Sequence, residues 1–178
     1  MKTAFQLIGG LFIALFLAGC KREINPPAHE QQQKLVDSAK AILSNPSNWK
    51  ANSSSLAEFI DAAAELNWSD KAEVKDFKLA AEDLVKFGTT WINRLDETES
   101  HNFNQGVSHI VGKVDSNLPG AQAAASVQIN SDDIEKNAAS ALGSSTTKLT
   151  PEQAEQFGKL FSKAVDCYEK IIKLRTTE

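Results

Sequence analysis

The chain is poor in the residues that build cross-linked or metal-binding sites. Its 178 residues include two cysteines, three histidines, one methionine and one tyrosine. Two cysteines, Cys20 and Cys167, are too few for a disulfide framework. The histidines, His29, His101 and His109, form no Glu-x-x-His pair, and no Cys-x-x-Cys-His motif occurs. The sequence therefore predicts no metal centre, no haem and no other cofactor.

A recognisable catalytic nucleophile is also missing. No Gly-x-Ser-x-Gly motif occurs, and the serines of "NSSS" and "GSSTT" have the composition of loops. Asp96, Glu97 and Glu99 form an acidic cluster without the spacing or central glycine of a calcium loop, so we expect them to solvate a helix end. Cys167 falls on the apolar face of the last expected helix, which indicates a buried small side chain rather than a catalytic thiol. We therefore expect a protein that is not an enzyme.

Basic residues are a minority. The chain has 19 Lys and Arg against 23 Asp and Glu, a net charge of -4, and the basic residues form no stripe along any segment. Nucleic-acid-binding domains usually show such a stripe together with a high isoelectric point. The charge pattern therefore disfavours nucleic acid as a partner.

Apolar residues are concentrated in one uncharged run at the start of the chain. Leu7 to Ala18 carries no charge, and Lys2 places a positive charge before it. A transmembrane helix needs about 20 apolar residues, so this run is too short to span a bilayer but fits the apolar core of a signal peptide. We expect residues 1–19 to be a signal peptide that is removed.

The apolar run ends at Leu17-Ala18-Gly19-Cys20, which closely resembles the lipobox of bacterial lipoproteins. In that family the cysteine sulfur receives a diacylglycerol, the signal is cut just before the cysteine, and the new amino terminus is usually acylated. The resemblance covers residues 1–20 and implies that Cys20 is a lipidation site that anchors the mature chain in a membrane. The alternative, an ordinary thiol at the end of a transmembrane helix, is disfavoured by the shortness of the run.

Residues 20–28 are expected to form a lipidated tether. Lys21 and Arg22 suit the anionic headgroup region, and Pro26-Pro27 favours an extended, semi-rigid spacer that reaches at most about 30 Å from Cys20. In enterobacterial lipoproteins an aspartate directly after the cysteine marks retention in the inner membrane. Lys21 is not that signal, so the resemblance implies the periplasmic leaflet of the outer membrane if the host has two membranes.

The remaining residues, 29–178, show the apolar spacing of amphipathic helices. The pattern predicts an all-α antiparallel bundle of about five or six helices. A capping box at Ser55-Leu56-Ala57-Glu58 is expected to open the second helix, and Ser69 or Asp70 the third, which should continue through Gly88 to Leu95. The helices are expected over 30–44, from Ser55 to 66, from 70 to 95, around 107–114, over 134–142 and over 151–172.

Two further boundaries complete this prediction. Asp132 with Glu135 is expected to cap the helix that Gly143 stops, and Thr150 caps the last helix with Pro151 at its first position and Gln153 completing a capping box. The stretch "GAQAAASVQINS", residues 120–131, is compatible with either a thin helix or a loop.

Tryptophans supply the candidate contact residues. Trp49 and Trp68 each follow an asparagine, at the two junctions that bracket the second expected helix, and Trp91 falls late in the third. Such rings either plug the ends of a bundle or dominate a partner surface. A turn between helices projects outward, so we take Trp68 and Trp49 as possible partner contacts.

Location and missing motifs together favour one class of function. We expect a membrane-anchored, periplasm-facing helical lipoprotein that acts as a non-enzymatic protein-interaction module of the assembly, exclusion or immunity type, with another envelope protein as its partner. The alternative is a ligand-binding or enzymatic bundle that acts on a lipid, a peptidoglycan fragment or a small molecule. A deep cleft lined by carboxylates or histidines would favour this alternative, whereas a filled core with a surface patch would favour the first.

Overall fold

The computed structural model describes residues 26–116 and 130–177. Within these ranges the chain forms six α-helices and one short 3₁₀ turn, with no strand, which confirms the predicted all-α bundle. The elements are α1 (Pro26–Ser44), α2 (Trp49–Glu65), α3 (Ala72–Thr90), η1 (Ile92–Arg94), α4 (Glu97–Ser116), α5 (Ser131–Ser145) and α6 (Pro151–Thr177). The predicted signal peptide, Cys20 and most of the ambiguous stretch at 120–131 lie outside the described residues.

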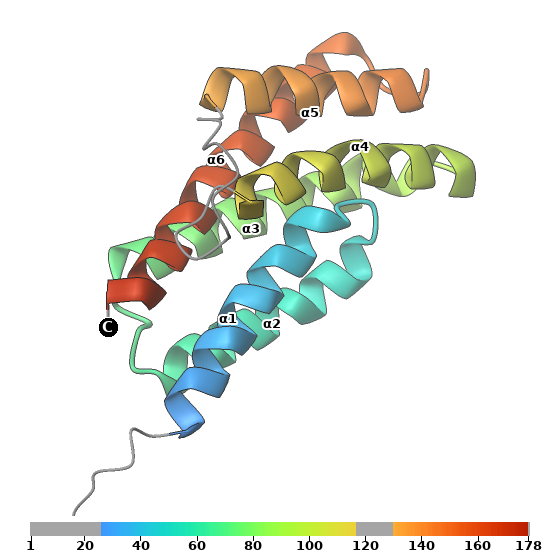
Figure 1. The fold of residues 1–178 in the computed structure, drawn as a ribbon. Helices are drawn as coiled ribbons and strands as arrows, with labels where there is room; N and C mark the ends of the chain where they lie inside the picture. The colour runs from blue at the N-terminus through green and yellow to red at the C-terminus, as the bar shows by residue number, and fades with distance from the viewer. Residues whose placement is uncertain (1–25, 117–129, 178) are drawn as a thin grey trace, which may run out of the picture.

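Consecutive helices run in opposite directions, so their connections alternate between the two ends of the bundle (Figure 1). One end, the near end, holds the start of α1, the turn at 66–71 and the end of α6. The other end, the far end, holds the connections 45–48, 91–96 and 146–150. Helices α1 and α2 form one hairpin, α4 crosses between α1 and α5, and α6 packs against α1, α3 and α5.

Phenylalanines from three helices form the centre of the core around Phe157 of α6. Its ring lies 5.0 Å from that of Phe103 in α4, 5.5 Å from Phe161 in α6 and 5.7 Å from Phe87 in α3, measured between centroids. All four side chains are buried. Aromatic pairs contribute about 0.5–1.5 kcal/mol each beyond the burial of their area. These ring contacts therefore hold α6 to both α3 and α4.

Small residues allow α5 to lie close to its neighbours. A Cβ at Gly158 of α6 would overlap the carbonyl oxygen of Glu135 in α5 and lie 3.1 Å from Ala139 Cβ. A Cβ at Gly106 of α4 would lie 2.7 Å from Ala141 Cβ, also in α5. Real Cβ atoms do not approach so closely, so these two glycines fix the separation of α5 from α6 and from α4.

The start of the last helix agrees with its predicted capping box. Thr150 donates its backbone N–H to Gln153 Oε1 at 2.9 Å, and Gln153 returns its backbone N–H to Thr150 Oγ1 at 3.3 Å. Pro151 is the first residue of α6, as predicted. Proline suits this position because its missing N–H has no intrahelical partner there.

Two other predicted helix starts are wrong. Helix α2 begins at Trp49 rather than at Ser55, because Asn48 caps it by accepting the backbone N–H of Ala51 at 3.2 Å. Helix α3 begins at Ala72 without a side-chain cap, and Asp70 instead forms an ion pair with Lys75 at 2.9 Å. The serines inside α2 are tolerated because a hydroxyl can bond to the preceding turn, as Ser53 does to the carbonyl of Trp49 at 2.9 Å.

Other boundaries also differ from the prediction. Helix α1 begins at Pro26, so the expected extended tether is shorter by the residues that α1 takes up. Helix α3 ends at Thr90, where the backbone of Trp91 leaves helical geometry, and does not continue to Leu95. Helix α4 extends over Glu97–Ser116, well beyond the expected 107–114. Helix α5 is capped by Asn130 rather than Asp132, and it passes Gly143 to end at Ser145.

Candidate functional site

Trp68 lies in the core and not on the surface. Its side chain is 5% exposed, and the expectation that it projects outward is therefore wrong. Asn67 has a φ of 57°, and the backbone N–H groups of Asn67 and Trp68 bond to the carbonyls of Ala64 and Ala63 at 3.0 and 2.8 Å. These bonds form a Schellman motif, in which the residue after the left-handed position folds back onto the last helical turn. The motif turns Trp68 inward at the near end, as the end-plug alternative requires.

Trp49 remains partly exposed at the far end. It is the first residue of α2, and it packs against Gly88 of α3, where an added Cβ would lie only 3.1 Å from Trp49 Cβ. The ammonium group of Lys50 lies 5.4 Å from the centroid of its ring. The absence of a side chain at Gly88 therefore lets α3 and the start of α2 meet, while Trp49 stays partly exposed.

Trp91, which the sequence did not single out as a contact, follows Gly88 at the end of α3. It caps α3 one turn after Gly88 and is also partly exposed, and the guanidinium carbon of Arg94 lies 4.7 Å from the centroid of its ring. Two partly exposed tryptophans, each with a neighbouring cation over the ring, thus occur at the far end. We call Trp49, Lys50, Trp91 and Arg94 the tryptophan–cation surface.

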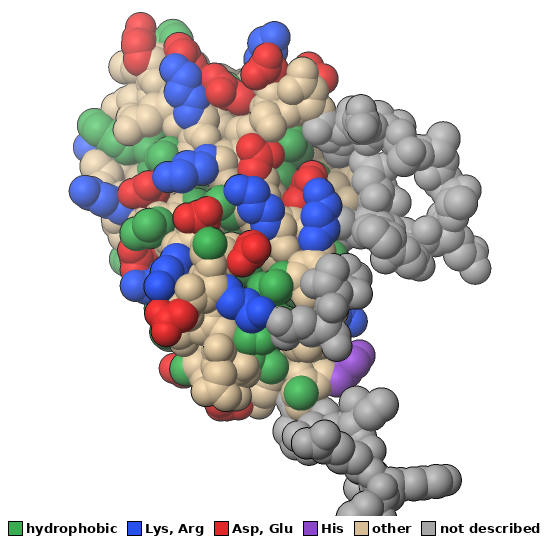
Figure 2. All heavy atoms as spheres, turned by 90° about the vertical axis from the view of Figure 1, so that its left-hand side faces the viewer, with side chains coloured by type: hydrophobic (Ala, Val, Ile, Leu, Met, Phe, Trp, Pro, Cys, Tyr) green, Lys and Arg blue, Asp and Glu red, His purple; other side chains and the backbone are tan. Residues whose placement is uncertain are grey.

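The segments that form this surface contain no acidic residue. Residues 45–53 and 86–95 together carry Lys50, Lys86 and Arg94, and none of the 23 acidic residues of the chain falls in them. The three cationic side chains are exposed, and none makes an ion pair with another described residue. The side of the molecule that lies on the left in Figure 1 differs from these two segments, because acidic and basic side chains are interspersed across it (Figure 2).

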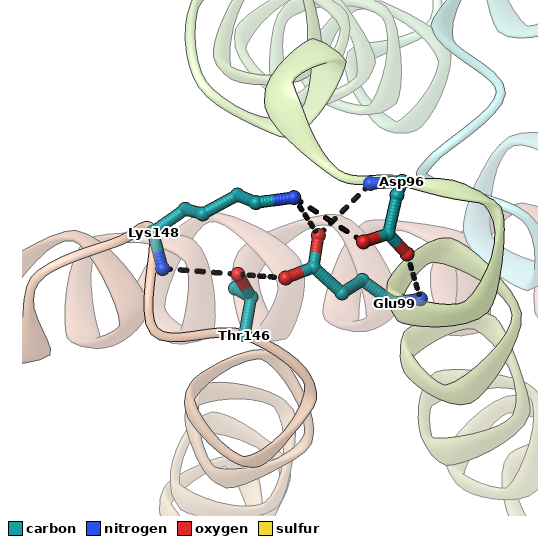
Figure 3. Close-up of polar contacts among 4 residues, drawn as sticks. All are labelled: Asp96, Glu99, Thr146 and Lys148. Atoms are coloured by element: carbon teal, nitrogen blue, oxygen red, sulfur yellow. Dashed lines mark hydrogen bonds and ion pairs between the residues drawn. The ribbon is translucent and has the colours of Figure 1, made fainter.

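A second polar feature of the far end joins the start of α4 to the loop between α5 and α6 (Figure 3). Asp96 and Glu99 form a capping box in which each carboxylate accepts the backbone N–H of the other residue at 2.9 Å. Lys148 donates to Glu99 Oε2 at 2.6 Å and to Asp96 Oδ2 at 3.3 Å. Thr146 donates its hydroxyl to Glu99 Oε1 at 2.8 Å.

These contacts shift the pKa of each charged member of the network. The backbone N–H of Glu99 lowers the pKa of Asp96, and the hydrogen bond from Lys148 lowers the pKa of Glu99. The same bond to Glu99 raises the pKa of Lys148. All three groups are therefore held in their charged forms, and the network has the properties of a structural clamp.

The histidines and Cys167 show no shared site. His29, His101 and His109 are all exposed, and within residues 26–116 and 130–177 no group of three or more His, Cys, Asp or Glu side chains is placed to hold a metal ion. Cys167 is buried, and burial raises the pKa of its thiol. The thiol is therefore protonated and packs in the core as a small apolar side chain.

Four of the described polar residues are buried, and all four are neutral. They are Ser38, Asn52, Thr146 and Ser162. Tyr168 is buried as well and donates its hydroxyl to Asp115 Oδ1 at 3.0 Å, while the other oxygen of that carboxylate pairs with Lys40. Burial and the nearby carboxylate raise the pKa of Tyr168, so its hydroxyl stays protonated and links α6 to α4 and α1.

None of the helices described in the structure combines the length and the apolar character that crossing a membrane requires.

Comparison with protein-family models, with curated proteins and with solved structures finds no match to this chain.

Proposed function

We propose that the chain is a lipid-anchored envelope protein whose helical domain binds another protein and performs no catalysis. Cys20 is the proposed anchor, through the lipobox Leu17-Ala18-Gly19-Cys20. The observation that carries the proposal is the tryptophan–cation surface, because partly exposed tryptophan and arginine are the side chains that most often dominate partner interfaces. The core of the described bundle is filled by apolar side chains from all six helices.

The position of α1 supports this arrangement. Helix α1 begins at Pro26, and the segment from Cys20 to Pro26 can span no more than about 20 Å. The near end, which contains the start of α1, is therefore held close to the lipid if Cys20 is acylated. The tryptophan–cation surface lies at the opposite end, one helix length of about 28 Å further on, where a partner can reach it.

Fractionation of cells that express two cysteine variants tests the anchor. Cys20→Ser should leave an unprocessed or released protein that no longer sediments with membranes, since the lipid chains supply the membrane affinity. Cys167→Ser is the matched control, because it removes the other cysteine and should sediment as the wild type does. Recovery of full-length Cys20→Ser protein in the membrane pellet at high salt would contradict the proposed lipidation.

Cross-linked pull-down of the lipidated protein from envelopes tests the interaction. Trp49→Ala should lower the recovery of the cross-linked partner while shifting the thermal midpoint little, because the ring is partly exposed. Trp68→Phe, at the other end of the bundle, is the control and should leave recovery unchanged. Equal recovery with Trp49→Ala and with the wild type would remove Trp49 from the proposed interface.

A further inference from the structure

We infer that the tryptophan–cation surface binds an acidic segment of a protein, with Lys50 and Arg94 as the groups that contact its carboxylates. This inference rests on the proposed function, because it names the chemistry of the partner that the far end would bind. It is carried by three features of the described residues: the position of each cation over a ring, the absence of acidic residues from both segments, and the internal pairing of two of the three acids that follow Arg94.

The first feature is that the two cations are already positioned. Lys50 lies 5.4 Å and Arg94 lies 4.7 Å from the centroid of the tryptophan ring that each accompanies. A ring face attracts a cation and restricts the conformations of its long side chain. Part of the entropy that binding normally costs is therefore lost before the partner arrives, which favours the capture of a carboxylate.

The second feature is the charge of the two segments. Residues 45–53 and 86–95 contain three cations and no acid, although the chain as a whole has a net charge of -4. Gly88 brings the two segments together by packing against Trp49. These two segments therefore present positive charge without acids of their own on an acidic protein, and an acidic partner would be steered to them while basic surfaces would be repelled.

The third feature is that two of the three acids that follow Arg94 at the start of α4, Asp96 and Glu99, are already paired. Asp96 and Glu99 both bond to Lys148, at 3.3 and 2.6 Å, and cap the start of α4. Their carboxylates face the α5–α6 loop across this network (Figure 3). Lys148 thus offsets part of the charge of these two carboxylates and holds them in the network, which leaves Lys50 and Arg94 available to an external anion.

The geometry favours a peptide over a sugar chain. A sugar binds tryptophan by stacking on a free ring face, but a cation already lies over each of these two rings. The exposed amide of Asn93 is also engaged, because it donates to the carbonyl of Thr89 at 2.7 Å. Carboxylates on a flexible peptide can reach both cations without a free ring face, so acidic side chains suit the surface better than a glycan.

Binding of a labelled ten-residue glutamate peptide to the full-length lipidated protein, held in neutral phosphatidylcholine vesicles, tests this inference. Lys50→Glu combined with Arg94→Glu should weaken binding by at least about tenfold, because it replaces both attractive contacts with repulsive ones. Lys136→Glu combined with Lys170→Glu makes the same change in net charge at exposed positions of α5 and α6 and should weaken binding less than about twofold at physiological salt. Added salt should weaken wild-type binding.

Three results would overturn the inference: no binding of the glutamate peptide to the wild type, equal losses in the two double variants, or tighter binding of a hyaluronate oligosaccharide than of the peptide. Lys50→Gln combined with Arg94→Gln should weaken binding less than the glutamate pair, and the thermal midpoint of every variant shows that it is folded. A negative result with normal membrane fractionation contradicts only the acidic partner, whereas loss of the wild type from the membrane pellet contradicts the anchor.

Discussion

Asn67 is the residue that determines where the neighbouring indole goes. Its φ of 57° is a left-handed conformation that asparagine tolerates better than most residues, and it lets the chain reverse directly after α2. Trp68 then follows at the position of a Schellman motif that usually carries an apolar side chain packed on the last helical turn. The near end of the bundle is closed by this ring, which belongs to the main core.

Replacement of Trp68 by alanine should therefore destabilise the fold. We expect Trp68→Ala to lower the free energy of unfolding by about 3–5 kcal/mol, the usual cost of truncating a buried aromatic side chain. Urea denaturation monitored by circular dichroism measures this loss. Trp49→Ala should cost clearly less, since its ring is partly exposed. A loss below about 1 kcal/mol for Trp68→Ala would mean that the ring is not packed as described.

Glycines in two helices provide a second test at the level of single residues. A Cβ at Gly158 would overlap the carbonyl oxygen of Glu135, and that oxygen belongs to backbone that cannot easily move. We expect Gly158→Ala to destabilise the protein by about 1–3 kcal/mol, as other overpacking substitutions do.

Gly112 is the matched control, because nothing lies within 4 Å of the Cβ that alanine would add there. It lies inside α4 and is exposed, so Gly112→Ala should stabilise the protein by about 0.5–1 kcal/mol through a better helix propensity. Chemical denaturation of both variants measures the two effects. Equal signs for the two substitutions would contradict the close approach of α5 and α6.

Among the elements, helix starts differ in how far local sequence determines them. Thr150, Pro151 and Gln153 leave one reasonable start for α6, and that prediction is confirmed. The start of α2 was predicted at the box at Ser55, because that local pattern is typical of a helix start, but the helix begins at Trp49. Contacts from outside the segment favour the earlier start, as the packing of Trp49 on Gly88 shows, and such contacts are invisible in a sequence read segment by segment.

The network at the start of α4 makes a prediction about pH. The pKa values of Asp96 and Glu99 are lowered in the folded protein from their ordinary values of 3.8 and 4.5. A group with a lowered pKa stabilises the fold fully above its ordinary value, and this stabilisation is lost as the pH falls through the folded value. We therefore expect Lys148→Met to lower stability at neutral pH and to make the loss of stability below about pH 4.5 less steep.

Thermal unfolding of Lys148→Met and the wild type between about pH 3 and pH 7 measures this difference. Lys159→Met is the matched control, because Lys159 pairs with Glu155 at 2.6 Å within α6, on an exposed face. Exposed pairs of this kind contribute little. An unchanged pH profile for Lys148→Met would show that the capping box alone, without Lys148, lowers the two pKa values.

At the scale of the whole molecule, the helical class was predictable because each apolar stripe has a helical period. The pairing of helices was not, since it depends on which aromatic and glycine side chains face one another across elements. The candidate surface shows the same division. Trp49 was recognised from its position after Asn48. Trp91 and Arg94 join the same candidate surface only because α3 packs against the start of α2, at Gly88 and Trp49. This packing joins residues that are far apart in the sequence, so local sequence patterns do not predict it.

The proposed anchor predicts how the domain is oriented at the membrane. If Cys20 is acylated, the short segment before Pro26 holds the near end, with Trp68, closer to the lipid than the far end, with Trp49. Helix α1 has 19 residues, so the two ends are separated by about 28 Å along the helix axis. Excitation transfer from an indole to a dansyl group on lipid headgroups falls steeply over such a distance. Single-tryptophan proteins, made by replacing the other two tryptophans with phenylalanine, can compare the two positions.

We expect the protein that retains only Trp68 to transfer more energy to dansyl-labelled lipid than the protein that retains only Trp49. Lipidated protein in vesicles is measured in both cases, and released Cys20→Ser protein serves as the control that should show no transfer. Equal transfer from the two tryptophans would mean that the bundle lies along the membrane. In that case the tryptophan–cation surface would face the same lipid as the near end, and a partner would have to compete with the membrane for Lys50 and Arg94. Stronger transfer from Trp68 instead leaves this surface directed away from the lipid, where an acidic partner can reach it.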